Sequence, residues 1–188
     1  MPIIVAVTGS PGSGKTTVAS AVAAELGVPL VSRDHFKIGI GLSSARADGA
    51  GGVEYDADFA VAGGSYSAAA EQAMVGVAEL LLAHNVSFVI ESSLLPTAAM
   101  ARLIELGARV ISVHVSASTA TISASLQARA SSGAPPALQL LDQHQNGQMR
   151  PELFQPVVGA LTTICLDTTV SEPPDTRAVR AAVHGALT

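Results

Sequence analysis

Apolar and polar residues alternate along the chain in two patterns. Short apolar runs rich in β-branched residues predict five strands, at residues 3–8, 28–32, 86–90, 109–115 and 161–166. The segments between them have apolar residues at helical spacing and predict helices at 15–26, 66–84, 96–106, 119–130 and 137–145, with a last helix from about Pro174. This alternation predicts an α/β fold, in which helices cover both faces of a parallel sheet and ligands bind at the carboxyl ends of the strands.

Residues 39–67 depart from this alternation. They are rich in glycine and lack the periodicity of a strand or a helix, and the segment is too long for a simple connection. We expect it to be a mobile segment on the substrate side of the molecule.

Length and composition favour one domain spanning residues 1–188. Hydrophobic residues make up 48% of the chain and charged residues 13%, and no apolar run approaches the roughly 20 residues that a membrane span needs. The apolar run at 3–7 lacks a basic flank, so we expect no signal peptide and a cytoplasmic location. Cys165 is the single cysteine, which precludes an intrachain disulfide, and we expect it in the core.

The charge distribution argues against long nucleic acids as partners. The formal net charge is −5, and lysine occurs only at Lys15 and Lys37. No broad cationic face is therefore available to neutralise a run of backbone phosphates. A small phosphorylated ligand such as a single nucleotide is compatible with this balance.

A phosphate-binding motif lies between the first predicted strand and helix. In "GSPGSGKT", Gly9, Gly14, Lys15 and Thr16 match the pattern G-x-x-x-x-G-K-[ST]. Its backbone N–H groups and helix N-terminus hold phosphates, with Lys15 as a catalytic residue at the β- and γ-phosphates and Thr16 as a ligand of Mg²⁺. We expect ATP and Mg²⁺ as cofactors. The residues expected to contact the nucleotide here are Gly9, Ser10, Pro11, Gly12, Ser13, Gly14, Lys15, Thr16 and Thr17.

Switches, motors, transporters and metabolite kinases all share this motif. The guanine-reading Asn-Lys-x-Asp tetrapeptide of switch GTPases is missing from the chain, and so is the transporter signature Leu-Ser-Gly-Gly-Gln. The sequence therefore favours a metabolite kinase that uses ATP.

Charged residues follow the second predicted strand in "VSRDHF". Phosphoryl transfer to an alcohol needs an acceptor for the hydroxyl proton, and Asp34 is our candidate for this catalytic base. The alternative is that Asp34 caps a helix beginning at His35. Arg33, His35 and Lys37, together with Asp34, are candidate substrate-binding residues, although each could also be an ordinary surface residue.

Glu91 follows the apolar run "FVI", where an acidic residue that holds a magnesium-bound water would follow its strand. Thr16 and Glu91 are thus the candidate metal ligands. Glu91 could instead cap the next helix or contact the substrate.

A lid is expected at about residues 129–150. The sequence "SSGAPP" at 131–136 interrupts two predicted helices, and Arg129 and Arg150 lie on either side of it. Such an arginine could close over the γ-phosphate and stabilise the transferred charge, which makes Arg129 a candidate catalytic residue. The alternative is that both are solvated surface residues.

With these motifs in place, the chain resembles the P-loop small-molecule kinases of the chloramphenicol phosphotransferase-like group, which are related to zeta-toxin and polynucleotide-kinase domains. The resemblance rests on "GSPGSGKT", "VSRDHF", "GGVEYDAD", "FVIESSLL" and "ICLDTT" and spans nearly the whole chain. It implies a P-loop NTPase three-layer sandwich with a five-stranded parallel sheet and a short lid. It also implies that Asp34 is the base, that Glu91 is the acid after the third strand, and that Asp167 and Thr168 border the adenine. Related kinases have two closely spaced lid arginines, whereas Arg129 stands alone here.

Three functions remain open from the sequence. The first is an ATP-dependent kinase acting on a hydroxyl of a small molecule, such as an antibiotic or specialised metabolite. The second is a kinase for a nucleoside, nucleotide sugar or polynucleotide 5′-hydroxyl. The third is a non-catalytic nucleotide-binding regulator, in which residues 39–67 order on ATP and recruit a protein partner.

Overall fold

A parallel sheet forms the centre of the computed structural model, which describes residues 1–47, 52–61, 63–131, 135–170 and 174–187. Its five strands lie in the order β2-β5-β1-β6-β7. Their bounds are β1 (Ile3–Gly9), β2 (Leu30–Ser32), β5 (Phe88–Glu91), β6 (Arg109–Ser116) and β7 (Thr162–Asp167). The predicted α/β fold with a five-stranded parallel sheet is therefore confirmed.

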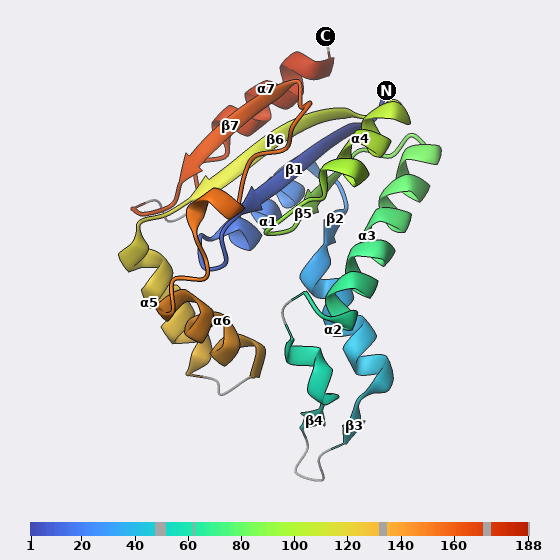
Figure 1. Cartoon of the computed structure of the whole chain (residues 1–188). Coiled ribbons are helices and arrows are strands. Elements are labelled where there is room, and N and C mark those ends of the chain that lie inside the picture. The colour runs from blue at the N-terminus through green and yellow to red at the C-terminus, as the bar shows by residue number, and fades with distance from the viewer. Residues whose placement is uncertain (48–51, 62, 132–134, 171–173, 188) are drawn as a thin grey trace.

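Helices cover both faces of this sheet (Figure 1). Helices α1 (Lys15–Leu26) and α7 (Arg177–Leu187) pack on one face, and α3 (Ser65–Ala83) and α4 (Thr97–Glu105) on the other. The side chains of a strand alternate between faces, so in β1 Ile4 packs with the α3 and α4 side whereas Val5 packs with the α1 side. All seven residues of β1 are buried because helices cover both of its faces.

The register of the sheet brings three strands together at Glu91. Glu91 ends β5, and it lies opposite Val7 of β1 and Ser32 of β2. The carboxyl ends of β2, β5 and β1 thus lie side by side, and the segments that follow them emerge at one edge of the sheet.

Two groups of smaller elements extend beyond this edge (Figure 1). On one side, α5 (Thr119–Ala130) and α6 (Pro135–Gln145) follow β6 and pack against each other, and the 3₁₀ helix η2 (Pro151–Leu153) comes after them. The other side has α2 (Arg33–Ser44), the hairpin of β3 (Arg46–Ala47) and β4 (Val53–Glu54), and the 3₁₀ helix η1 (Ala57–Ala60).

The prediction that residues 39–67 lack regular elements is wrong for much of that segment. Helix α2 continues to Ser44, and β4, η1 and the start of α3 occupy much of the rest, while residues 48–51 and 62 lie outside the described part. Gly41 shows why a high glycine content does not exclude regular elements in this segment. A Cβ on Gly41 would lie 2.5 Å from the Phe59 ring, so this glycine allows η1 to pack closely on α2. The Phe59 ring also stacks on Tyr55, with centroids 4.2 Å apart.

The expected burial of Cys165 is also wrong. Cys165 lies on β7, which is the edge strand beside β6, and its side chain is exposed. The apolar pattern of residues 161–166 predicted the strand but carried no information about its place in the sheet. Among the described residues, no helix is long and apolar enough to cross a membrane.

Gly9 ends β1 where the chain has room for no side chain. Its φ is +147°, and a Cβ there would lie 2.2 Å from the carbonyl oxygen of Val115 on β6. We expect Gly9→Ala to reduce the free energy of unfolding by about 2–4 kcal/mol, because an alanine combines backbone strain with a steric clash. Urea unfolding followed by circular dichroism measures the change.

Gly76→Ala is the control for that substitution. Gly76 lies within α3, and a Cβ there would have no atom within 4 Å, so we expect unchanged or slightly higher stability. Equal effects of the two substitutions would contradict the packing described at the end of β1.

Candidate active site

The turn between β1 and α1 has the conformation that the glycine motif predicts. Gly12 and Gly14 have φ of +84° and +81°, in the left-handed region that glycine adopts readily, and Gly14 occupies the N-cap position of α1. The first N–H groups of a helix lack partners within that helix, and with the helix dipole they form a site for an anion. The turn can therefore hold phosphate groups.

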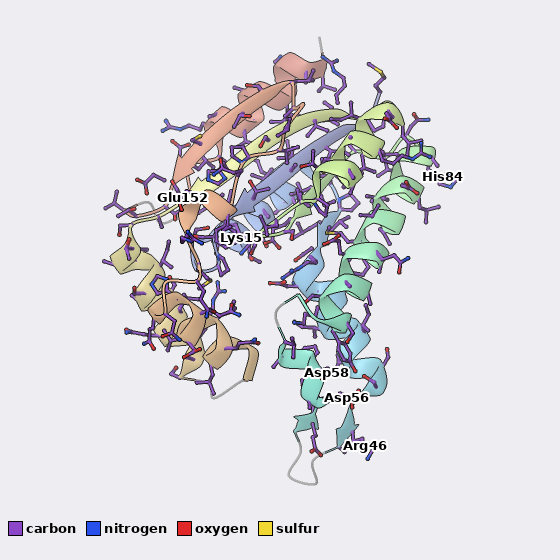
Figure 2. The ribbon with its side chains drawn as sticks, in the orientation of Figure 1. Lys15, Arg46, Asp56, Asp58, His84 and Glu152 are labelled. Atoms are coloured by element: carbon purple, nitrogen blue, oxygen red, sulfur yellow. The ribbon has the colours of Figure 1, made fainter. Side chains whose placement is uncertain are left out.

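Lys15 is the first residue of α1 and is almost completely buried. Its Nζ lies 3.8 Å from Oε1 of Glu91. Burial lowers the pKa of Lys15, and although the negative charges of Glu91 and Asp34 raise it, Arg129 and Arg33 lower it further, so the net shift is downward. An ammonium group removed from water in this way is stabilised by a nearby anion, which the phosphates of a nucleotide would supply. Figure 2 shows Lys15 at the carboxyl end of β1, well away from Arg46, Asp56 and Asp58 on the outlying segment.

Glu91 is the acidic counterpart of Lys15, with a side chain that is 1% exposed. Ser32 donates a hydrogen bond of 2.6 Å to Oε2 of Glu91, and Thr16 donates a longer one of 3.5 Å to Oε1. These contacts turn the carboxylate towards the phosphate-binding turn, which places both predicted metal ligands at the same point. Glu91 does not start the next helix, because α4 begins at Thr97.

Two observations test whether this centre suits a nucleotide with Mg²⁺. The hydroxyl oxygens of Ser13 and Ser92 are buried and have no hydrogen-bond partner among the described residues, as expected of groups placed to meet a polar ligand. The Thr16 and Glu91 oxygens are the hard ligands that Mg²⁺ prefers alongside phosphate oxygens. No cluster of three or more His, Cys, Asp or Glu able to hold a metal occurs in the described part, so phosphate and water would complete the coordination. These residues therefore suit a nucleotide bound together with Mg²⁺.

Asp34 lies in the first turn of α2. The helix begins at Arg33 with Ser32 at its N-cap, so the alternative in which Asp34 caps a helix starting at His35 is wrong. Oδ1 of Asp34 accepts hydrogen bonds of 2.8 and 3.3 Å from the Arg33 guanidinium. Partial desolvation raises the pKa of Asp34, but the hydrogen bonds and charge of Arg33, with the charges of Lys15 and Lys37, outweigh it and hold that pKa below its ordinary value. Asp34 is therefore ionised at neutral pH and lies within electrostatic range of Lys15.

The other predicted substrate residues lie in different surroundings. Arg33 lines the large cleft described below. Lys37 instead points its Nζ towards the carbonyl oxygen of Val61, at 3.5 Å, and lies 5.4 Å from the centre of the Phe59 ring. His35 is exposed, and neither His35 nor Lys37 is among the described residues that line the cleft. A role for these two in substrate binding stays a prediction.

The structure separates the two lid arginines. Arg129 lies near the end of α5 and is exposed, and its positive charge contributes to lowering the pKa of Lys15. Arg150 precedes η2 and is not among the charges that shift the pKa of Lys15 or of Asp34. The electrostatics thus favour Arg129 as the arginine nearer the phosphate site. Residues 132–134 of the predicted lid lie outside the described part.

Thr168, which follows β7, contacts the backbone of the phosphate-binding turn. Nothing in the sequence indicated this contact. The hydroxyl oxygen of Thr168 lies 2.8 Å from the carbonyl oxygen of Ser13 and 3.1 Å from that of Ser116, so its one hydrogen is shared between these two acceptors. Asp167 accepts a 2.8 Å hydrogen bond from the backbone N–H of Thr169, and hydrogen bonds from Thr169 lower the pKa of Asp167. The segment after β7 thereby fixes the turn against β6. Contact of Asp167 and Thr168 with adenine stays a prediction.

A cleft of about 1250 Å³ opens beside this centre. Its walls come from the phosphate-binding turn at Pro11, α2 at Arg33, one face of α3, the loop after β5, α6, and the segment around η2. The cleft therefore lies between the two groups of outlying elements, where an acceptor molecule could reach the phosphate site. The α3 face was missed because its polar residues have the pattern of an ordinary solvent-exposed face.

Comparison with known proteins places the chain in a family. A family model described as an AAA domain matches residues 4–156. The chain belongs to this AAA domain family. The match runs from β1 past η2, so the AAA domain includes the phosphate-binding turn, Asp34, Glu91 and every wall of the cleft. No curated protein matches the chain.

Several solved structures share this fold of the AAA domain. A protein of Chloroflexus aurantiacus to which kinase activity is attributed has a TM-score of 0.75 at 24% identity, covering 99% of this chain and 96% of the other. A sugar kinase of Janibacter has a TM-score of 0.52 at 19% identity, with coverage of 98% and 93%. A gluconokinase of Sinorhizobium meliloti has a TM-score of 0.50 at 19% identity, with coverage of 98% and 90%. The architecture is therefore that of P-loop kinase-like proteins.

The contact between Ser32 and Glu91 provides a test of the site. Ser32→Ala removes a charge-assisted hydrogen bond from a buried carboxylate, and we expect it to reduce the free energy of unfolding by about 1.5–3 kcal/mol. Ser92→Ala is the control, because the Ser92 hydroxyl is equally buried but has no hydrogen-bond partner among the described residues, and its removal should change stability little. Urea unfolding compares them, and similar losses in both variants would show that Ser32 does not support Glu91.

Proposed function

We propose that this protein is an ATP-dependent phosphotransferase, which moves the γ-phosphate of ATP to a hydroxyl of a small molecule. The observation that carries the proposal is the position of Asp34. Its ionised carboxylate pairs with Arg33, which lines the cleft, and lies within electrostatic range of the buried Lys15, although Asp34 itself is not among the described lining residues. A phosphate-binding turn alone serves many functions, whereas a carboxylate that interacts with the lysine of that turn and pairs with a cleft residue suits transfer to an alcohol.

The nucleotide would lie along the turn at residues 9–17. The backbone N–H groups at the start of α1 would hold its phosphates, and Lys15 would neutralise charge on the β- and γ-phosphates. Thr16 and Glu91 would hold Mg²⁺, which when bound neutralises the charge that develops on the phosphate oxygens. In the ligand-bound state, Lys15 would exchange its weak contact with Glu91 for contacts with phosphate.

Asp34 would accept the proton of the acceptor hydroxyl. As the new bond forms between that oxygen and the γ-phosphorus, the bond from the γ-phosphorus to its bridging oxygen breaks, and the products are ADP and a phosphate ester. A carboxylate of low pKa is a weak base, but phosphoryl transfer requires little proton abstraction before the transition state and depends mainly on positioning. The contact with Arg33 supplies that positioning.

Arg129 is the arginine that we assign to the lid. Its charge acts on Lys15 from α5, which lies on the other side of the sheet edge from α2 (Figure 1). Movement of α5 towards the phosphate-binding turn would bring the Arg129 guanidinium to the γ-phosphate, where it would stabilise charge in the transition state.

The comparisons support the proposal at the level of the fold. The Janibacter sugar kinase, the Sinorhizobium gluconokinase and the Chloroflexus protein to which kinase activity is attributed share the arrangement of elements with this chain. The resemblance to the chloramphenicol phosphotransferase-like group narrows the proposal to small specialised metabolites, including antibiotics, as acceptors.

Substitution of Asp34 tests the proposed chemistry. Asp34→Asn cannot accept the proton, so we expect phosphate transfer from labelled ATP to an accepted alcohol to fall by about 10²–10⁴-fold, with nucleotide affinity changed little. Asp175→Asn is the control, because Asp175 also pairs with a neighbouring arginine on the surface but lies before α7.

Full transfer by the Asp34→Asn variant would contradict the assignment of Asp34. A protein that binds ATP but transfers phosphate to no acceptor in a broad panel would instead favour a nucleotide-binding regulator.

The contact between Arg33 and Asp34 predicts a pH dependence. Because the folded protein holds the pKa of Asp34 below its ordinary value, activity that needs the ionised carboxylate is kept at mildly acidic pH and lost only as pH falls through that lowered pKa. Arg33→Gln removes the hydrogen bonds and the charge that lower the pKa of Asp34 most. The pKa of Asp34 should therefore rise, and we expect the acid limb of the kcat profile to move to higher pH. Arg180→Gln, in which a surface arginine paired with Glu25 is replaced, should leave the limb in place. An unmoved limb in Arg33→Gln would contradict this origin of the shift.

A further inference from the structure

The cleft beside the phosphate site is poor in positive charge. Among the described residues that line it, Arg33, Glu71 and Glu79 carry charged side chains. Arg33 pairs with Asp34, with 2.8 Å between Nη2 and Oδ1, and Glu79 pairs with Arg102 of α4, at 3.5 Å. Each of these two charges is therefore balanced by its own partner.

Glu71 is different, because it has no ion pair or hydrogen bond among the described residues. It is partly buried in the middle of the cleft-lining face of α3, where Ser67, Glu71, Val75 and Glu79 follow one another at intervals of four residues. Counting Arg33 with Asp34, and Glu79 with Arg102, leaves one uncompensated negative charge in the cleft. That charge belongs to Glu71.

The uncharged side chains that line the cleft include both amides and apolar groups. Side-chain amides come from Gln72, Gln143 and Gln148, and they can donate to and accept from hydroxyl groups. Apolar surface comes from α6 at Leu140 and from Met149. The volume of about 1250 Å³ suits an acceptor of drug size or larger.

We propose that the acceptor is a hydroxylated compound with a protonated amino group, and that Glu71 binds this group. The proposal rests on the proposed phosphotransferase function and names its substrate class. A carboxylate without a partner in a recessed site gains a charge-assisted hydrogen bond from an ammonium group, whereas a phosphate or carboxylate on the acceptor would be repelled. The net charge of −5 on the chain also attracts cations and repels anions. Acceptors such as nucleotides and sugar acids are therefore disfavoured.

The test compares matched sets of acceptors. Amino sugars, aminocyclitols and aromatic amino alcohols, their N-acetyl derivatives, and their phosphate esters are titrated calorimetrically into the protein, and each is also assayed for phosphate transfer from labelled ATP. We expect the free amines to bind at least tenfold more tightly than their N-acetyl derivatives, with a preference that weakens as salt is raised.

Two variants assign the effect to one side chain. Glu71→Gln keeps the shape of the side chain but removes its charge, and it should weaken amine binding at least tenfold while changing N-acetyl binding less than twofold. Glu79→Gln is the matched control. It removes the same charge from the same helix face, but from a carboxylate that already pairs with Arg102, and we expect it to have less than a twofold effect.

The outcomes separate the substrate class from the function. Equal or tighter binding of the N-acetyl or phosphate forms, no binding of any amine, or amine binding indifferent to Glu71→Gln would overturn the proposed class. Transfer to neutral or phosphorylated acceptors alone would overturn it while supporting the phosphotransferase. Amines that bind through Glu71 but receive no phosphate would support the ligand class and contradict the phosphotransferase.

Discussion

The buried contact between Lys15 and Glu91 is the interaction on which the site depends. Burying either charge alone is unfavourable by several kcal/mol, and the Coulomb attraction between them compensates only when other polar groups assist. Here Ser32 and Thr16 donate hydrogen bonds to the carboxylate, and Lys15 is the first residue of α1. The contact of 3.8 Å is longer than a strong hydrogen-bonded pair, so the ammonium group keeps the capacity to bind an additional anion.

This contact requires the sheet to be assembled in one register. Glu91 lies opposite Val7 and Ser32, so its carboxylate meets the β1–α1 turn and the Ser32 hydroxyl only when β5 lies between β2 and β1. Thr168, after the edge strand β7, then fixes the other side of the turn through Ser13. The polar centre is therefore organised before a nucleotide binds, which reduces the reorganisation that catalysis would require.

The charge pattern changes from this centre to the cleft. At the centre, Lys15, Arg33 and Arg129 act together and suit the phosphates of a nucleotide. In the cleft, the balance is negative because Glu71 has no partner among the described residues. The two parts of the site thus select opposite charges, and this difference would keep a second nucleotide out of the acceptor position.

The fold and the phosphate-binding turn could be predicted from the sequence because both have local patterns, namely β-branched runs and a glycine motif at fixed spacing. Contacts between residues far apart in the sequence, and properties that depend on strand order, could not be predicted. The contact of Thr168 with Ser13 joins residues 155 positions apart, and the exposure of Cys165 depends on the order of the strands. The glycine-rich composition of residues 39–67 predicts a mobile segment, but Gly41 within it provides space for Phe59. The polar face of α3 acquires significance only because other elements enclose a cleft against it.

The most direct measurement of the central claim is the calorimetric affinity of the protein for ATP, ADP and AMP, each with and without Mg²⁺. If Lys15, Thr16 and Glu91 are organised around the β- and γ-phosphates, ATP with Mg²⁺ should bind most tightly, AMP should bind far more weakly, and Mg²⁺ should change AMP binding least. Equal affinities for the three nucleotides, or affinities that do not respond to Mg²⁺, would contradict the account.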